Sequence, residues 1–348
     1  MASPAEHPGF PDQGAAQSPA TTARSGQVAR LVDLRGGDLL SSADLTTGQT
    51  QALLELAADL KSGHRAIDVG GKVLGLIFSK ASTRTRVSFS VAMARLGGQT
   101  IDLLPTVTQV GRGEPVADTA RVLSRYCDAL AIRTFAQSDL EDYAHWASIP
   151  VINALTDLEH PCQALADYLT MAENFASSPD GRLDLDRLRG LTLAYVGDGN
   201  NVAHSLMLCG ALLGVNVRIG TPPGFAPDAT VLRQAQELAG GACAISVVHD
   251  PLDAVRGAQA LYTDVWASMG QEEEQAERER AFAGWCLDES LLSEADPRAI
   301  VLHCLPAHRG EEISAGVIEG SASRVFDQAE DRKSTRLNSS HTVISYAV

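Results

Sequence analysis

The segment with the strongest chemical signature is STRTR at positions 82–86, in which hydroxyl side chains are interleaved with two guanidinium groups. It lies between a predicted strand, Val73–Phe78, and a predicted helix, Thr85–Leu96. The first N–H groups of a helix lack partners and carry the positive end of its dipole, so they attract anions. Guanidinium groups add paired hydrogen bonds to phosphate oxygens. This junction favours a phosphate site over the alternative, a capped helix with two solvated arginines.

A second candidate is the turn HPCQ at positions 160–163, which follows a predicted strand, Val151–Asn153, and precedes the predicted helix Cys162–Ala172. The fixed φ of Pro161 would direct His160 and Gln163 to the same side of the chain. An imidazole there could polarise a carbonyl oxygen. A His-Pro turn on its own is more often structural, and that alternative stays open.

Two later segments also follow predicted strands. In DVWASMG, positions 264–270, Asp264 could pair with an ammonium group while Ser268 holds a carboxylate; the alternative is a helix cap with a packed Trp and Met. In HCLP, positions 303–306, Cys304 could be a nucleophile, a substrate contact or a buried small side chain. Ligands of open α/β sheets bind at such carboxyl ends of strands.

The glycine-containing turn GDGNN at positions 197–201 invites comparison with a dinucleotide-binding loop. The third glycine of that motif is missing, and Arg218 and Gly220 stand where a ribose-binding acid would be expected. NAD binding is therefore disfavoured. The amides of Asn200 and Asn201 suit a small zwitterion instead.

The elements that must position these residues alternate between apolar runs and helical periods, which predicts an α/β fold with two domains and mostly parallel sheets flanked by helices. The 348 residues agree with two domains as a prior. The predicted division is a first domain at 31–168 and a second at 169–332. The predicted strands are Val73–Phe78, Ala129–Ile132, Val151–Asn153, Leu191–Val196, Val215–Ile219, Ala260–Tyr262 and Ile300–His303.

Composition excludes several classes of function. A formal net charge of −15 makes nucleic acid an unsuitable partner, because phosphate-backbone binding needs a basic face. The six cysteines form no CxxC or Cys/His pattern suited to zinc, which fits a reducing, cytoplasmic location. We find no apolar run of the roughly 18 residues that a membrane span needs.

The two ends of the chain differ from the rest. Residues 1–30 are rich in Ala, Ser, Pro and Gly without a hydrophobic period, so we expect a disordered extension. Residues 333–348 are basic, Ser/Thr-rich and without a helical period, so we expect a non-native tail and leave it out of the fold prediction.

Taken together, STRTR, HPCQ, GDGNN, DVWASMG and HCLP resemble the aspartate/ornithine carbamoyltransferase family over residues 31–332. The last two segments look like its ornithine branch. The resemblance implies transfer of a carbamoyl group from carbamoyl phosphate to the δ-amine of L-ornithine, giving citrulline and phosphate. It also implies a homotrimer with shared active sites, no cofactor and no metal. Because family members continue into a C-terminal helix, we expect the altered tail to lower stability.

The resemblance assigns roles by position. The implied catalytic residues are Arg133, His160, Cys304 and Arg332. The implied carbamoyl-phosphate site adds Ser82, Thr83, Arg84, Thr85, Arg86, Gln109, Gln163 and Leu305. Gln109 would reach the phosphate of a neighbouring subunit. The implied ornithine site comprises Asn201, Asp264, Ser268 and Met269. The alternatives are a carbamoyltransferase for another amine such as putrescine, or a catalytically silent homologue.

Overall fold

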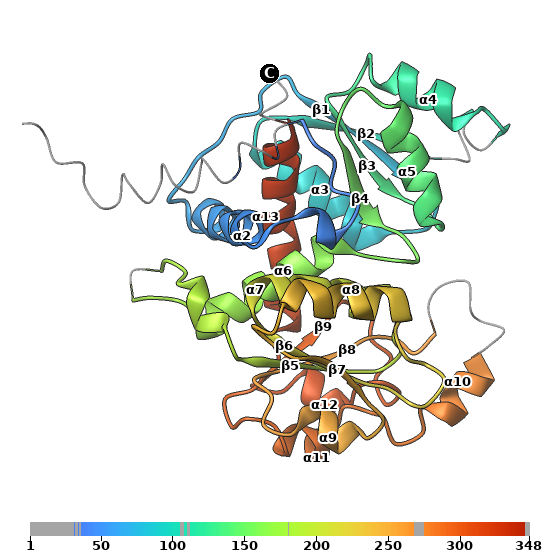
Figure 1. The fold of residues 1–348 in the computed structure, drawn as a ribbon. Helices are drawn as coiled ribbons and strands as arrows, with labels where there is room; N and C mark the ends of the chain where they lie inside the picture. The colour runs from blue at the N-terminus through green and yellow to red at the C-terminus, as the bar shows by residue number, and fades with distance from the viewer. Residues whose placement is uncertain are drawn as a thin grey trace, which may run out of the picture.

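The computed structural model describes residues 31, 34, 36–104, 108–109, 112–179, 181–267 and 275–344, with the backbone alone for residues 275 and 336–344. These residues form two parallel sheets stacked one above the other in Figure 1. No described helix is both long and apolar enough to cross a bilayer.

The first sheet has the strand order β2-β1-β3-β4, and every pair is parallel. Its strands are β1 (Val73–Phe78), β2 (Gln99–Leu103), β3 (Ala129–Arg133) and β4 (Val151–Leu155). The chain also forms a 3-10 turn η1 (Ser42–Asp44) and the helices α2 (Thr47–Ser62), α3 (Thr83–Arg95), α4 (Val116–Leu123) and α5 (Gln137–Trp146). Helix α2 begins with a capping box between Thr46 and Gln49 and ends at Gly63 in the left-handed conformation.

The second sheet has the order β7-β6-β5-β8-β9, again with every pair parallel. Its strands are β5 (Thr192–Val196), β6 (Asn216–Gly220), β7 (Ile245–Val248), β8 (Ala260–Thr263) and β9 (Ile300–His303). The helical elements of this half are η3 (Leu185–Leu188), α7 (Asn201–Leu213), α8 (Ala229–Ala239), α9 (Pro251–Val255), α10 (Gln275–Ala281), α11 (Glu289–Ser293) and α12 (Ala315–Ile318).

The predicted fold class is confirmed, and all seven predicted strands are present with ends shifted by at most two residues. The prediction missed β2 and β7. Both are edge strands. Strand β2 is mostly exposed, and β7 has only four residues, so neither shows the continuous apolar run of a strand buried on both faces.

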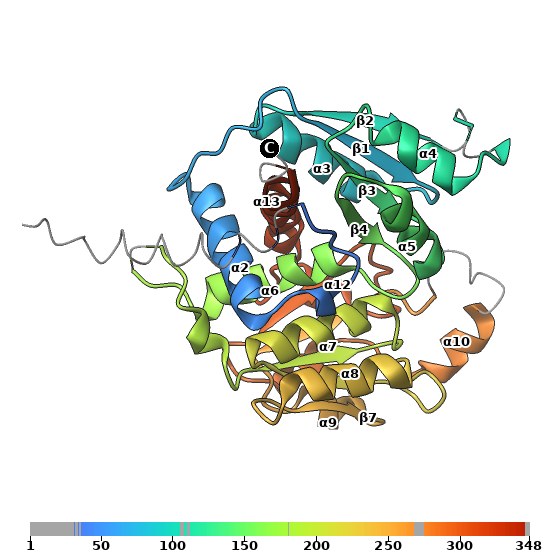
Figure 2. The same cartoon turned by 45° about the horizontal axis from the view of Figure 1, so that its top comes forward.

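Two helices lie between the sheets: α6 (Pro161–Phe175) and α13 (Val325–Ile344). Figures 1 and 2 show α13 rising from the second sheet alongside α2 and α3. One buried apolar cluster is continuous through this region and contains residues of both sheets, such as Leu76 and Tyr195. Separate clusters cover the outer faces of each sheet. Helix α6 is unbroken at the predicted boundary between residues 168 and 169, so that division remains a prediction.

Residues 333–344, in which the sequence shows no helical period, are helical and continue α13. Ser334 and Thr335 are buried. Packing against α2, α3 and α6 stabilises a helix that the sequence pattern did not indicate. The origin of this segment stays a prediction. Residues 1–30, expected to be a disordered extension, lie outside the described residues.

Candidate active site

The cationic half of the site lies where β1 and β3 end. Ser82 is the N-cap residue of α3, but its side chain forms no capping hydrogen bond. It accepts a hydrogen bond instead from Nη1 of Arg133, the last residue of β3, at 3.3 Å. The STRTR segment therefore opens a helix as predicted, and one of its hydroxyl groups faces a buried arginine.

A second arginine reaches the same place from the far end of the chain. Arg332 on α13 donates through Nη2 to Oγ1 of Thr85 at 3.0 Å and through Nη1 to the carbonyl of Cys304 at 3.2 Å. It is buried. These contacts join α3 of the first sheet to the end of β9 in the second, so Arg332 lies where the two halves meet.

The arginines here carry uncompensated charge. Burial, followed by repulsion from Arg332 and Arg84, lowers the pKa of Arg133 to about 10. Burial also lowers the pKa of Arg332. Among the described residues, none of Arg84, Arg133 and Arg332 lies within ion-pair distance of a carboxylate. Clustered cations without a directly paired carboxylate create a positive local potential, which is what an anionic ligand requires.

The remaining STRTR residues lie differently. Thr83 and Arg84 are exposed. Arg86 pairs with Asp102 on β2, with Nε and Oδ1 2.9 Å apart, and its guanidinium lies 5.4 Å from the Phe78 ring centre. Arg86 is therefore engaged within its own sheet, and its contact with phosphate stays a prediction.

The HPCQ turn lies at the start of α6, and a polar face of α7 holds the loop in front of it. The backbone N–H of His160 donates to Ser205 Oγ at 2.8 Å, and Ser205 donates to Glu159 at 3.0 Å. One turn earlier on α7, Asn201 donates to the carbonyl of Thr156 at 2.6 Å. Residues four apart on a helix share a face, so α7 positions the loop that carries His160.

Gln163 lies in the first turn of α6, fully buried. Its amide nitrogen donates to Asp167 Oδ1 at 2.6 Å. Its oxygen has no hydrogen-bond partner among the described residues. A buried acceptor without a partner is costly unless a ligand supplies the donor.

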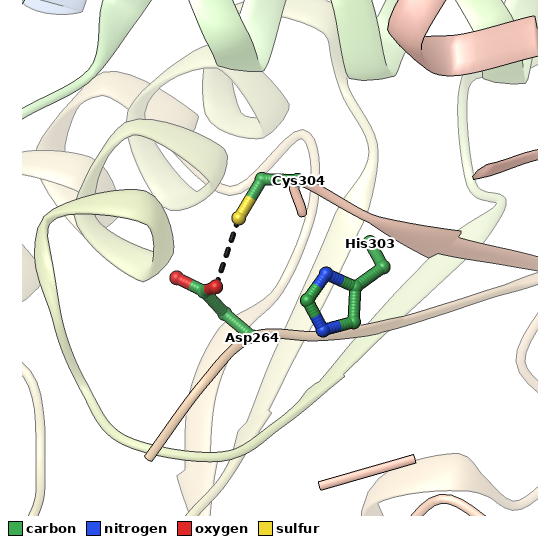
Figure 3. Close-up of side chains that lie close together, drawn as sticks. All are labelled: Asp264, His303 and Cys304. Atoms are coloured by element: carbon green, nitrogen blue, oxygen red, sulfur yellow. Dashed lines mark hydrogen bonds between the residues drawn. The ribbon is translucent and has the colours of Figure 1, made fainter. Parts of the chain in front are cut away.

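The acidic half of the site lies at the ends of β8 and β9, where Figure 3 shows Cys304 directed at Asp264. The Cys304 thiol donates to Asp264 Oδ1 at 2.9 Å, and Asn200 donates to Asp264 Oδ2 at 3.1 Å. Burial first, and then Asp264, raise the pKa of Cys304 well above its usual range. Cys304 is therefore a neutral thiol at neutral pH, which disfavours a nucleophilic role.

Asp264, His303 and Cys304 offer possible metal-ligand atoms within 4.8 Å of one another (Figure 3). Each group already has a protein partner. His303 Nδ1 accepts from Leu305 N–H at 2.8 Å, which assigns the ring proton to Nε2, 3.1 Å from Glu312 Oε1. We interpret this group as a hydrogen-bonded support for the loop, in which Leu305 adopts an uncommon positive φ of 58°.

Close packing of the chain requires a glycine at the second glycine position of the GDGNN turn, Gly199. A Cβ at Gly199 would lie 2.2 Å from Pro227 N, because the loop after β6 passes directly over this turn. Gly199 also donates to the carbonyl of Phe225 at 2.9 Å. This close approach explains the glycine without a pyrophosphate.

The predicted roles of three further site residues are not tested by the described contacts. Ser268 and Met269 lie outside the described residues. Just after the gap that contains them, Arg278 of α10 forms a buried ion pair with Asp198, with nitrogen and oxygen 2.7 Å apart, and so ties α10 to the GDGNN turn. Gln109 is exposed in the loop between β2 and α4, and its contact with a neighbouring subunit stays a prediction.

Sequence reasoning missed Asp167 and Ser205, which hold Gln163 and His160, and Gln328, which holds the backbone of His303. Of the two asparagines that the sequence analysis named, Asn200 rather than Asn201 contacts Asp264. A signal was present for Asn200, because an asparagine before a helix often caps it: Asn200 Oδ1 accepts from Val202 N and thereby turns its amide nitrogen toward Asp264.

Two parallel sheets, with clustered arginines at the end of one and a carboxylate–thiol pair at the end of the other, define a two-domain α/β enzyme that binds an anion beside a second substrate. The chain belongs to the aspartate/ornithine carbamoyltransferase family. The family's carbamoyl-P binding domain matches residues 37–173, and its Asp/Orn binding domain matches residues 189–337.

Individual relatives agree. The chain is 70% identical to the ornithine carbamoyltransferase of Parasynechococcus marenigrum (strain WH8102) over 311 residues, 89% of this chain and 95% of that protein. The crystal structure of the Gloeobacter violaceus ornithine carbamoyltransferase is 52% identical, with a TM-score of 0.79 over 89% of this chain and 99% of that one. The Pyrococcus furiosus enzyme is 45% identical, with a TM-score of 0.84 over 90% and 98%.

Proposed function

We propose that this protein transfers the carbamoyl group of carbamoyl phosphate to the δ-amine of L-ornithine, releasing citrulline and phosphate. The observation that carries the proposal is the convergence of Arg133 and Arg332 on the hydroxyl groups of Ser82 and Thr85, without a carboxylate partner among the described residues. The 70% identity to a named ornithine carbamoyltransferase supports the same reaction.

In the proposed site, the first turn of α3 and the side chains of Ser82, Thr83, Arg84, Thr85 and Arg86 bind the phosphate. Arg133 and His160 stabilise the oxyanion that forms on the carbamoyl carbonyl. One such donor is typically worth about 3–4 kcal/mol of transition-state stabilisation. Gln163 accepts a hydrogen bond from the NH₂ of the carbamoyl group. Arg332 and the loop at Cys304 and Leu305 form the remaining contacts with the carbamoyl group.

Ornithine would lie on the second sheet. Asp264 and Cys304 face the attacking amine, and Asn201, Ser268 and Met269 hold the amino-acid end. Asn201 now donates to Thr156, so binding of ornithine would replace or bend that hydrogen bond. Placing both substrates between two rigid sheets supplies the orientation that a bimolecular reaction otherwise lacks.

The proposal is tested by a citrulline assay with carbamoyl phosphate and three acceptors: ornithine, putrescine and N-acetylornithine. We expect product with ornithine and at most traces with the other two. Preference for putrescine would reassign the acceptor. Absence of product from a folded protein that still binds carbamoyl phosphate would identify a silent homologue.

We also propose that the protein assembles as a homotrimer through its first sheet. The edge strand β2 carries Ile101, 46% exposed, and the outer face of α3 carries Val87 and Val91, 53% and 37% exposed. Gln109 follows β2 and would reach the phosphate of the next subunit. Sedimentation equilibrium should give three times the monomer mass, and Val87→Lys combined with Ile101→Lys should lower it.

None of the six cysteines, all of which lie in the described part of the chain, forms a disulfide, which supports the proposal that the protein acts in the reducing environment of the cytoplasm.

A further inference from the structure

Asp167 accepts hydrogen bonds from two glutamine side chains that come from different helices. It lies on α6 one turn after Gln163 and is fully buried. The amide nitrogens of Gln163 and Gln328 both lie 2.6 Å from its Oδ1 atom. Oδ1 is an acceptor when the carboxyl is ionised and also when it carries its proton on Oδ2, so both glutamines present nitrogen to Asp167.

This constraint decides which atom of Gln163 faces the site. Because Nε2 points to Asp167, Oε1 points the other way, and it has no partner among the described residues. A rotated amide would place oxygen against oxygen at Asp167 and present a donor to the site. Asp167 therefore makes Gln163 an acceptor, which suits a ligand N–H rather than a ligand carbonyl.

Gln328 extends the arrangement to the second sheet. Its oxygen accepts from the backbone N–H of His303 at 2.8 Å, one residue before Cys304. Arg332 lies one turn further along α13 and donates to the Cys304 carbonyl. Asp167 thus connects the three elements α6, β9 and α13, each of which carries predicted site residues.

A purely structural role does not explain the arrangement well. Asp167 is fully buried, and a buried carboxylate usually costs stability compared with an apolar side chain of similar size. A role for Asp167 in orienting Gln163 would explain why this buried position holds a carboxylate.

We propose that Asp167 is a positioning residue that locks the amide of Gln163 with its oxygen toward the NH₂ group of carbamoyl phosphate. This inference rests on the proposed function. Asp167 itself does not touch the substrate; it selects a substrate that carries a donor at that position.

Acetyl phosphate provides the probe, because it has the same phosphate and carbonyl groups but a methyl group in place of NH₂. Steady-state citrulline formation gives the KM for carbamoyl phosphate, and acetyl phosphate is tested as a competitive inhibitor. The ratio of its Ki to that KM measures recognition of the NH₂ group. We expect Asp167→Leu to lower this ratio by about tenfold, the effect of one hydrogen bond, and Asp167→Asn, which keeps an acceptor, to retain it within about threefold.

A double-mutant cycle shows whether Asp167 acts through Gln163. Gln163→Met should lower the ratio as Asp167→Leu does, and the double variant should lower it no further. Asp331→Leu is the matched control: it removes another buried carboxylate, one that is bonded to Thr170 and Lys61 rather than to Gln163, so the ratio should not change. Asp167→Ser, which withdraws the acceptor by one atom, replaces Asp167→Leu if that variant does not fold.

An unchanged ratio in a folded Asp167→Leu or Asp167→Ser variant would overturn the inference. So would equal losses in Asp167→Asn and Asp167→Leu, or multiplicative losses in the double variant. Each of these results is obtained by comparison with a wild-type protein that makes citrulline. They would therefore overturn the inference about Asp167 and leave the proposed function intact. A wild-type protein that neither makes citrulline nor binds carbamoyl phosphate overturns the proposed function first.

Discussion

Arg332 and Thr85 are separated by 247 residues, yet the Nη2 atom of Arg332 lies 3.0 Å from the Oγ1 atom of Thr85. The bond joins the helix that ends the described chain to the helix that STRTR opens. Because the same guanidinium also donates to the carbonyl of Cys304, its planar group fixes the distance between the two halves of the site.

The first prediction concerns this geometry. Arg332→Lys keeps the charge but cannot reach both Thr85 and the Cys304 carbonyl in one plane. We expect kcat/KM for carbamoyl phosphate to fall by about 10²-fold, as when one preorganised donor is lost, and Arg332→Ala to fall further. Thermal melting serves as the control for folding. Full activity in the Lys variant would show that charge alone is required.

The second prediction follows from the bond between Cys304 and Asp264. Burial and the nearby carboxylate raise the pKa of the thiol, so alkylation of Cys304 by iodoacetamide should be slow at pH 7 and should accelerate only at alkaline pH. Asp264→Asn should shift that acceleration to lower pH. Peptide mass spectrometry separates Cys304 from the other five cysteines. Rapid alkylation at pH 7 in the unaltered protein would contradict this assignment.

The sequence predicted the parallel strands and their order along the chain because their apolar runs are buried on both faces. Ile77 and Leu261, for example, are almost fully buried. The edge strands β2 and β7 escaped prediction because most of their side chains are exposed or only partly buried. The other two edge strands, β4 and β9, are buried and were predicted, so the apolar pattern indicates burial rather than pairing.

The candidate site shows the same limit. Its motifs could be placed because each follows a strand and so reaches the same edge of a sheet. The hydrogen bonds that orient these motifs could not be predicted, since Asp167 and Gln328 are 161 residues apart and neither belongs to a motif. Helix α13, which residues 333–344 continue without a helical period in their sequence, packs against α2, α3 and α6.

The third prediction concerns pH and stability. Burial raises the pKa of Asp167 to about 7, above its unfolded value of 3.8. The folded state therefore binds this proton more tightly than the unfolded state does. The stabilisation that the proton provides is fully present below pH 3.8 and is lost as pH rises through about 7, by at most about 1.4 kcal/mol per pH unit. Asp167→Asn removes this dependence.

Urea unfolding of both proteins between pH 5 and pH 8 provides the measurement. The free energy of unfolding of Asp167→Asn, relative to the unaltered protein, should rise with pH and level off above about 7. Asp331, whose pKa burial also raises to about 7, is present in both proteins and cancels in the difference. A flat difference would mean that Asp167 titrates alike in the folded and unfolded chains.

The fourth prediction concerns the C-terminal helix. Ser334 is fully buried on α13, and its hydroxyl has no hydrogen-bond partner among the described residues. An unsatisfied buried hydroxyl is destabilising, and alanine is also the better helix former. We expect Ser334→Ala to raise the free energy of unfolding by about 0.5–1.5 kcal/mol. Ser314→Ala, which removes the side-chain cap of α12, should instead lower it by about 1 kcal/mol. A lower free energy of unfolding in Ser334→Ala would show that the Ser334 hydroxyl has a hydrogen-bond partner. It would also show that the C-terminal part of α13 is better adapted to this fold than its sequence indicates.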